Sequence, residues 1–193
     1  MASKKTNLRG FTLIEMTTVI GVTVLLVFIL YQVLLVSNNS FRAGDQGLEL
    51  IQNGRIVLDR LSRELRQSVE IVTVMPVTKT DPLLDPPTEI LFQDGHNLTD
   101  IQYIRYYLDG TDLKRQRIVY TFSEEPNTYV YWDAIDAFSQ SPDATVIDEK
   151  IIAEYISNII YYGADLKNIE IFLNLGDSAT HFFTSIWGRN NRH

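Results

Sequence analysis

The fold is decided by residues 11–36, which read FTLIEMTTVIGVTVLLVFILYQVLLV. Glu15 is the one charged residue in this stretch, and no charged residue lies between Met16 and Phe41. As an α-helix the stretch is about 39 Å long, which exceeds the roughly 30 Å of hydrocarbon in a bilayer. Residues 11–36 therefore predict a transmembrane helix.

The flanks of this stretch predict its orientation, since a basic flank stays on the cytoplasmic side of the membrane. The basic residues ahead of it are Lys4, Lys5 and Arg9. Behind it, Arg42 is offset by Asp45 and Glu49. We therefore expect the N-terminus in the cytoplasm and the rest of the chain exported. An ordinary secretory signal has a shorter apolar core and then a small-residue cleavage site, which residues 37–42 do not offer.

A basic leader of ten residues ends in Gly10, and the aromatic Phe11 and the carboxylate of Glu15 follow it. This arrangement resembles the class III signal of type IV prepilins and type II secretion pseudopilins. The resemblance implies that prepilin peptidase, a membrane-embedded aspartyl peptidase, cuts after Gly10 and N-methylates Phe11. Residues 1–10 would then be a cleaved leader, and the apolar helix would remain in the inner membrane.

Glu15 is a candidate functional residue, because a carboxylate inside an apolar span costs about 2.5 kcal/mol or more. It lies about one helical turn from Phe11. On a neighbouring subunit, its carboxylate can pair with the ammonium that cleavage creates at Phe11. Such a pair offsets the cost and sets the axial register between helices. The alternative is that Glu15 lies near the inner interface and snorkels to the lipid headgroups.

A second helical pattern follows the span, with apolar residues recurring at spacings of three, four and seven. These residues are Leu50, Val57, Leu58, Leu61, Leu65 and Val69. They predict an amphipathic helix from Asp45 to Val69, within a segment, residues 37–75, that forms the outer half of the long helix. Gly44, Gly47 and Gly54 weaken it by up to about 1 kcal/mol each.

Charged residues fill the other face of this second helix. They are Arg55, Asp59, Arg60, Arg63, Glu64 and Arg66. Because the acids and the bases alternate at helical pair spacing, we interpret this face as solvated and salt-bridged. A role in subunit contact stays open.

Residues 76–193 predict an exported β-rich domain, which begins with a proline-rich loop at Thr78–Thr88. Strands are predicted at Glu89–Gln93, Ile101–Leu108, Leu113–Phe122, Tyr129–Trp132, Asn158–Tyr162, Ile169–Leu175 and His181–Ile186. Asp109-Gly110 predicts a type I′ turn, and Ile147–Ile156 is either a short strand or a helical turn. The predicted fold class is α+β and pilin-like, with a long N-terminal helix packed on an antiparallel β-sheet domain.

Three later segments extend the resemblance, namely the helix Ile56–Ser68, the hairpin Tyr106–Leu113 and the ending Thr184–Asn190. Together they are similar to the minor pseudopilin J and to W-type minor pilins. Gln32, where many major pilins have a helix-bending proline, and the lack of cysteine also favour a minor subunit. The resemblance implies an assembly-priming or tip component of a type IV pilus or type II secretion-like fibre.

The same resemblance implies the partners of the chain. They are other minor pilins or pseudopilins and the major pilin through helix packing, prepilin peptidase, the inner-membrane assembly platform and membrane lipid. The C-terminal domain would be periplasmic or extracellular, in a pilus or pseudopilus. Whether the fibre serves secretion, piliation or DNA uptake stays open.

Composition excludes several other classes. The 193 residues include 17 Lys or Arg and 24 Asp or Glu, for a net charge of −7, so no nucleic-acid partner is expected. No cysteine and only three histidines, His96, His181 and His193, argue against thiol catalysis and most metal hydrolases. No catalytic or cofactor-binding constellation stands out, so the chain is not expected to be an enzyme.

Two weaker alternatives come from residue clusters. Five acids could gather a calcium ion, as some pilin-family loops do, although their spacing is not that of an EF-hand. These acids are Asp133, Asp136, Asp143, Asp148 and Glu149. The tyrosines could form a platform for stacking a ligand, although aromatic residues are expected on half-buried strands.

Two other functions compete with the assembly role. The first is an adhesive or DNA-uptake minor pilin whose acidic, aromatic domain binds a surface ligand. The second is a membrane-anchored hydrolase, which would need buried, strongly shifted carboxylates in a cleft.

Overall fold

The computed structural model describes residues 12–96 and 100–188. In these residues the elements are α1 (Leu13–Gln67), β1 (Ile90–Gln93), β2 (Tyr103–Asp109), β3 (Asp112–Phe122), β4 (Glu125–Val130), β5 (Asp143–Ala153), β6 (Ile156–Tyr162), β7 (Leu166–Leu175) and β8 (Ser178–Trp187). The chain divides into two compact units, Met1–Asp45 and Gln46–His193, and each is described by itself.

The first unit contains the N-terminal part of α1. Every side chain from Leu13 to Val36 is exposed in the single chain. A helix of this length and apolar composition can cross a bilayer, and exposed apolar side chains in such a number suit lipid or partner helices. Within the described residues, the sequence prediction of one membrane-spanning helix at the N-terminus therefore agrees with the structure.

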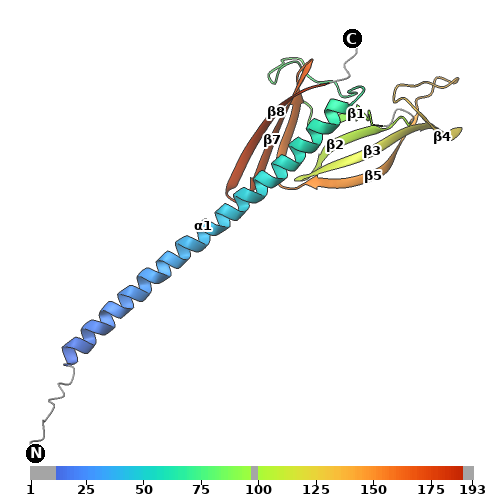
Figure 1. Ribbon diagram of the computed structural model, residues 1–193. Coiled ribbons are helices and arrows are strands. Elements are labelled where there is room, and N and C mark those ends of the chain that lie inside the picture. Colours follow the sequence, from blue (N-terminus) through green and yellow to red (C-terminus); the bar gives the residue numbers. More distant parts are fainter. Residues whose placement is uncertain (1–11, 97–99, 189–193) are drawn as a thin grey trace, which may run out of the picture. The chain divides into compact units, whose positions relative to one another are not determined.

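In the second unit, one face of α1 packs against two sheets. The residues buried on that face are Leu50, Gly54, Val57, Leu61, Glu64 and Leu65. Their helical spacing is the reason that this part of the chain forms an amphipathic helix, as the sequence predicted. Figure 1 shows β7 and β8 on one side of this part of α1, and β2, β3 and β5 on the other.

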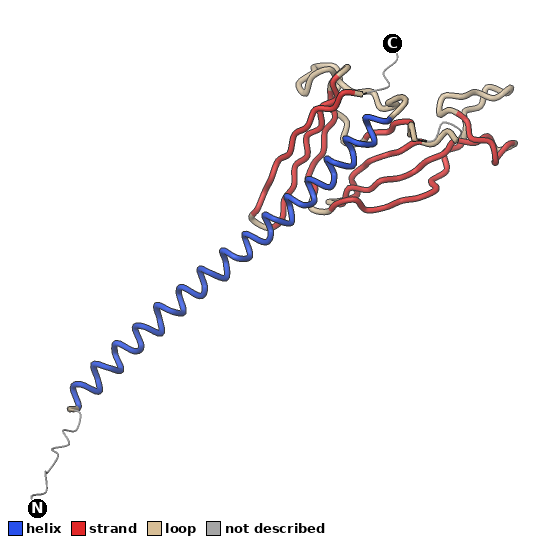
Figure 2. Tube along the Cα trace, in the orientation of Figure 1, coloured by secondary structure: helices blue, strands red, loops and turns tan. Residues whose placement is uncertain are grey.

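Two antiparallel sheets complete the second unit (Figure 2). The first, sheet A, has the order β1-β2-β3-β4, and β5 pairs with the other edge of β3. The second, sheet B, has the order β6-β7-β8. The core lies between the sheets and α1, and its largest fully buried side chains include Phe92, Tyr106 and Tyr161. The predicted α+β class with a long N-terminal helix on antiparallel sheets is confirmed.

The helix ends at Gln67, before both Val69 and the predicted limit of the segment at residue 75. The residues after it run beside β1, because Val69 donates its N–H to the carbonyl of Gln93 and Val72 donates to the carbonyl of Leu91. β-Branched side chains favour this extended backbone over a helix. The residues that the sequence pattern assigned to the last turn of the helix therefore bond to β1 of sheet A.

The β2–β3 hairpin is confirmed, but its turn differs from the predicted type I′ turn at Asp109-Gly110. Asp109 pairs with Asp112, so the two loop residues are Gly110 and Thr111. Gly110 has a φ of 64°, whereas Thr111 is not among the residues with positive φ. A glycine with positive φ at the first loop position alone is a feature of type II′ turns, which also match the twist of a hairpin.

The ambiguous segment Ile147–Ile156 belongs to two strands and not to a helical turn. β5 runs through it to Ala153, and β6 begins at Ile156. Tyr155 between them has a φ of 64°, a conformation that interrupts a strand. Smaller differences concern β4, which begins at Glu125 and not at Tyr129, and β8, which begins at Ser178 and not at His181.

Candidate functional site

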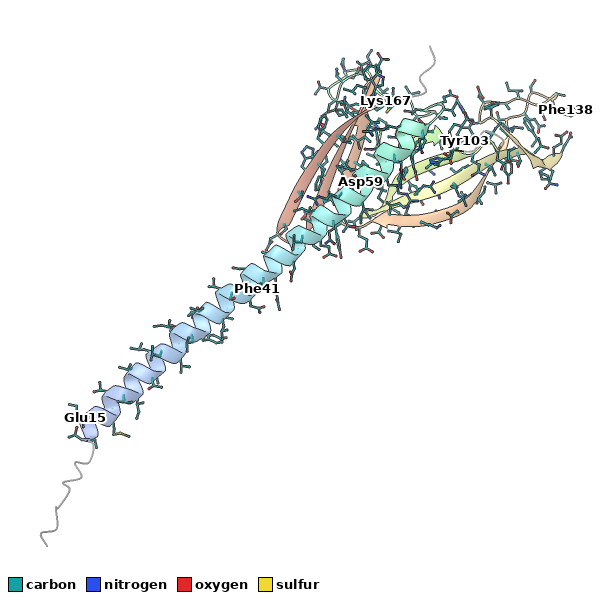
Figure 3. The ribbon with its side chains drawn as sticks, viewed as in Figure 1. Glu15, Phe41, Asp59, Tyr103, Phe138 and Lys167 are labelled. Carbon is teal, nitrogen blue, oxygen red and sulfur yellow. The ribbon has the colours of Figure 1, made fainter. Side chains whose placement is uncertain are left out.

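The predicted processing site, Gly10 and Phe11, lies outside the described residues. The predicted assembly residue, Glu15, lies in the first turn of α1 (Figure 3). Its surroundings are therefore the part of the predicted site that the structure defines. Thr12, immediately before the helix, is its partner there.

Thr12 and Glu15 bond to one another reciprocally. The Glu15 Oε2 atom accepts the backbone N–H of Thr12 at 2.9 Å and the Thr12 hydroxyl at 3.0 Å. In return, the backbone N–H of Glu15 donates to Thr12 Oγ1 at 3.3 Å. This is a capping box, in which two helix N–H groups without intrahelical partners are bound by side chains.

The geometry leaves part of the Glu15 carboxylate open. Both hydrogen bonds that the carboxylate accepts from Thr12 go to Oε2, and within the described residues Oε1 accepts no hydrogen bond. The capping box turns the carboxylate toward the N-terminal end of α1, where the helix dipole also favours a negative charge. The capping box can therefore fix the orientation of the Glu15 carboxylate while its Oε1 atom stays available to a cation.

Thr12 is a residue that sequence reasoning missed. The signal was present, because Thr12-Leu13-Ile14-Glu15 has the threonine and the glutamate at capping-box spacing, immediately before an apolar run. Neither the pairing nor the snorkelling interpretation of Glu15 considered that the carboxylate has a bonding partner in its own chain.

A second charged site, which the sequence pattern did not predict, is buried between α1 and sheet A. Glu64 is 7% exposed, so its assignment to a solvated face is wrong. Its Oε2 accepts hydrogen bonds from the Tyr106 hydroxyl at 2.7 Å and from Arg115 Nε at 3.1 Å. Its Oε1 accepts Arg60 Nε at 3.3 Å. A carboxylate can be buried here because cations and a hydroxyl replace its water.

The protonation states around Glu64 follow from this burial. The pKa of the Tyr106 hydroxyl lies well above its ordinary value. Burial is the main cause, and the negative charge of Glu64 adds to it. For Arg115, burial favours loss of the proton, but the hydrogen bond that Arg115 donates to Glu64 and the charge of that carboxylate outweigh it and raise the pKa. Tyr106 therefore stays neutral and Arg115 stays charged, and the site acts as a fixed link between α1 and β3.

A third carboxylate, Glu170, is buried in sheet B beneath the loop that follows the helix. It accepts hydrogen bonds from Lys79 Nζ at 2.6 Å and from the Tyr162 hydroxyl at 2.8 Å, and His181 Nε2 lies 3.3 Å away. Burial favours the protonated acid, but Lys79 and Tyr162 outweigh it and lower the pKa of Glu170. The interaction fastens Lys79, from the proline-rich connection, to β7.

The arginine-rich face of α1 agrees in part with the solvated interpretation. Arg55, Arg63 and Arg66 are exposed, and within the described residues none of the three forms an ion pair with a carboxylate. A shallow groove of about 350 Å³ is lined by Asp59, Ser62, Arg63, Arg66 and Gln67. Because its lining contains both arginines and an aspartate, we interpret this groove as part of the polar face of the helix.

The five acids considered for calcium are not brought together. Asp136 accepts backbone N–H groups of its own loop, and Asp143 accepts the hydroxyl of Ser123 at 3.0 Å. Glu149 accepts bonds from the side chains of Tyr107 and Gln116 on sheet A. Within residues 12–96 and 100–188, no group of three or more histidine or acidic side chains could hold a metal ion.

Three of the tyrosines are buried and take no part in a surface platform. Tyr103, Tyr106 and Tyr161 are each at most 1% exposed, and Tyr106 and Tyr161 belong to the core between α1 and the sheets. Tyr103 packs edge-on against Tyr120, with ring centroids 5.1 Å apart. These rings are packing residues on strands, which is the interpretation that β propensity favoured.

No protein-family model matches this sequence, and no curated protein matches it. The fold and the residues described above are therefore the observations on which a functional proposal rests.

Proposed function

We propose that the chain is a single-pass pilin-like subunit that primes assembly of a type IV pilus or a type II secretion-like fibre, or forms part of its tip. In this proposal the leader is removed after Gly10, α1 anchors the subunit, and the β-rich domain is exported. No catalytic role is assigned to any residue. Other pilin-like subunits, prepilin peptidase and the inner-membrane assembly platform are the proposed partners.

The geometry of Glu15 is the observation that carries this proposal. An apolar span does not need an acid in its first turn, and placing one there is costly. Its Oε2 is bound by Thr12, while Oε1 accepts no hydrogen bond within the described residues. The ammonium at Phe11 of a neighbouring processed subunit would be a partner of the right charge for this oxygen. Pairing in the low dielectric of the membrane would then fix how far one helix is displaced along the next.

The architecture also supports the proposal. A long helix with an apolar N-terminal part and an amphipathic part packed on antiparallel sheets suits a subunit that is held in the membrane and displays a folded domain outside it. The N-terminal part exposes its whole apolar surface in the single chain, so it is suited to contact with lipid before assembly and with other helices after it.

Three substitutions separate the roles of charge and of capping. Glu15→Gln removes the charge, but glutamine can still complete a capping box. Thr12→Val removes the capping hydroxyl and keeps the charge. Glu15→Ala removes both features and leaves an apolar span that should still insert and be cleaved.

The measurement is co-isolation of each processed variant with other pilin-like subunits, together with fibre formation or secretion. We expect Glu15→Gln and Glu15→Ala to lose assembly and Thr12→Val to retain most of it. Assembly at the wild-type level with glutamine at position 15 would rule out charge pairing. Assembly with alanine there would show that Glu15 only snorkels, and the proposed function would lose its main support.

A further inference from the structure

The loop between β4 and β5 exposes large apolar side chains at the end of sheet A. The exposed fractions are 52% for Tyr131, 37% for Trp132, 68% for Ile135 and 69% for Phe138. We call these four residues the tip surface. Figure 3 shows Phe138 at the outer end of this loop, far beyond Tyr103 on the strands. Scattered apolar residues on a surface are ordinary, but four within eight residues of one loop are a local concentration that calls for an explanation.

This loop is held in place by hydrogen bonds, so the exposure of its apolar residues is not a result of disorder. At its start, Trp132 donates its backbone N–H to the hydroxyl of Tyr103, which is fully buried. Farther along, Asp136 Oδ1 accepts the N–H groups of Phe138 at 2.8 Å and Gln140 at 2.7 Å. Ser139 completes the turn with a φ of 63°. Ordering this loop costs conformational entropy, although its apolar side chains remain in water.

Charge distinguishes this end of sheet A from the rest of the chain. Residues 118–149 contain no Lys or Arg and seven acids, which equals the whole net charge of −7. Removing these seven from the 24 acids leaves 17, the same as the number of Lys and Arg residues. The seven acids are Glu124, Glu125, Asp133, Asp136, Asp143, Asp148 and Glu149.

Five of these acids lie near the tip surface. The other two, Asp148 and Glu149, lie farther along β5, where they pair with Arg117, Lys150 and Lys114. Glu124 and Glu125 are at the β3–β4 turn, and a hydrogen bond of 3.0 Å from Ser123 to Asp143 joins that turn to the far end of the loop. Asp133 lies within the loop and is exposed. An apolar patch with a rim of one charge selects a partner with an apolar patch and the opposite rim charge.

We propose that the tip surface docks a cationic amphipathic polypeptide, that is, a protein segment whose apolar stripe is bordered by Lys or Arg. This binding role is independent of the helix packing proposed for fibre assembly. Side chains that stand in solvent do not enclose a small molecule, which favours an extended protein partner. Acids around the loop also oppose docking on the anionic surface of a membrane.

The test uses the full-length chain in a neutral detergent, with Trp187→Phe introduced so that Trp132 is the remaining tryptophan of the two in the sequence. Trp132 belongs to the tip surface, so its emission reports binding at that place. The probes are a helical peptide of Lys and Leu, a Glu/Leu peptide with the same apolar stripe, and a Lys/Ser peptide with the same charge. We expect a shift of Trp132 emission with the Lys/Leu peptide alone, and weaker binding at higher salt.

Two groups of variants test the surface itself. Phe138→Ser with Ile135→Ser removes apolar area, and Glu124→Gln, Glu125→Gln and Asp133→Asn together remove three rim charges. Each should weaken binding of the Lys/Leu peptide on the order of tenfold or more. The matched controls are Leu83→Ser, an apolar residue 93% exposed elsewhere, and the combination of Asp85→Asn, Asp165→Asn and Asp177→Asn. Both controls should bind like the parent chain.

Several results would overturn the proposal. Equal binding of the Glu/Leu peptide would remove the charge argument, and equal binding of the Lys/Ser peptide would remove the apolar one. Parent-like affinity in both tip variants would place binding elsewhere. A shift of Trp132 emission on adding phosphatidylcholine vesicles without peptide would identify a bilayer, and not a polypeptide, as the occupant.

Discussion

The hydroxyl of Tyr106 on β2 donates a hydrogen bond of 2.7 Å to the carboxylate of Glu64 on α1, across 42 positions of sequence. The same carboxylate is paired with Arg115 on β3, whose side chain is 10% exposed. A buried ion pair of this kind adds little net stability, because the loss of hydration offsets the attraction, but removing one partner leaves a buried charge uncompensated. It fixes which turn of α1 faces which strands of sheet A.

Glu64→Gln should therefore be strongly destabilising. The amide keeps the size of the side chain but leaves Arg115 buried without a counter-charge, so the free energy of unfolding should fall by about 3 kcal/mol. Urea unfolding of the full-length chain in neutral detergent, followed by tryptophan fluorescence, measures the change. Asp59→Asn, at an exposed acid on the same helix, should change it by less than about 0.5 kcal/mol. A similar small effect at both positions would contradict the role given to Glu64.

Gly54 should resist enlargement although it lies inside a helix. A Cβ at this position would overlap the ring of Phe182 on β8, whereas a Cβ at Gly47 would meet nothing within 4 Å. Gly47→Ala should raise the free energy of unfolding by up to about 1 kcal/mol through helix propensity. Gly54→Ala should lower it by about 1 kcal/mol or more, because overpacking outweighs that gain. Adding Phe182→Leu should recover part of the loss, and independent, additive effects would argue against this close approach.

Stability should decrease in acid through Glu170. Its pKa is lowered in the folded protein below the ordinary 4.5 by Lys79 and Tyr162, which outweigh the opposing effect of burial. Its contribution is therefore fully present above pH 4.5 and is lost as the pH falls through the folded-state pKa. Melting temperatures measured from neutral pH downward should fall less steeply for Glu170→Gln than for the parent chain below pH 4.5. Parallel curves would mean that Lys79 does not stabilise the charged form.

Processing should remove residues 1–10. Intact-mass analysis of protein from cells with prepilin peptidase should give residues 11–193 with one added methyl group at Phe11. Gly10→Val should accumulate the full-length form in the membrane, because a branched side chain would crowd the peptidase beside the scissile bond. The class III signal interpretation fails if the parent chain keeps its leader, or if it is cut beyond Val36.

Calcium should leave the melting temperature of the chain unchanged at millimolar concentration. The acids considered as calcium ligands are engaged separately, for example Asp143 with Ser123 and Glu149 with Gln116. A ligand that binds the folded state alone would raise the melting temperature with its concentration. A rise that depends on calcium and is absent with magnesium would restore the metal interpretation.

The features that could be predicted from the sequence are those set by local pattern. The apolar run of residues 11–36 and the helical spacing from Leu50 to Leu65 gave the helix, and Ile, Tyr and Phe gave most strands. Glu64 could not be predicted, because its spacing from Arg60 suits a solvated pair equally well. Its burial depends on Tyr106 and Arg115, which are distant in sequence and close only in the fold.

The candidate site shows the same division. The cost of an acid in an apolar span singled out Glu15, and Thr12 at capping-box spacing could have been recognised beside it.

The positive φ of Tyr155, which separates β5 from β6, has no comparable local signal, since tyrosine rarely adopts that conformation. Tertiary packing decides such a position, and a single sequence carries little information about it.

The lack of Lys and Arg around the tip surface also affects how proteases act on the chain. Trypsin cleaves after Lys and Arg, and neither residue occurs between Arg117 and Lys150. An exposed loop is ordinarily the first place to be nicked, but the loop that carries Phe138 offers this enzyme no bond to cut. A protease specific for acidic residues would find its sites there instead. The charge pattern of the loop thus protects the tip surface from trypsin-like proteases and opens it to proteases that cleave at acidic residues.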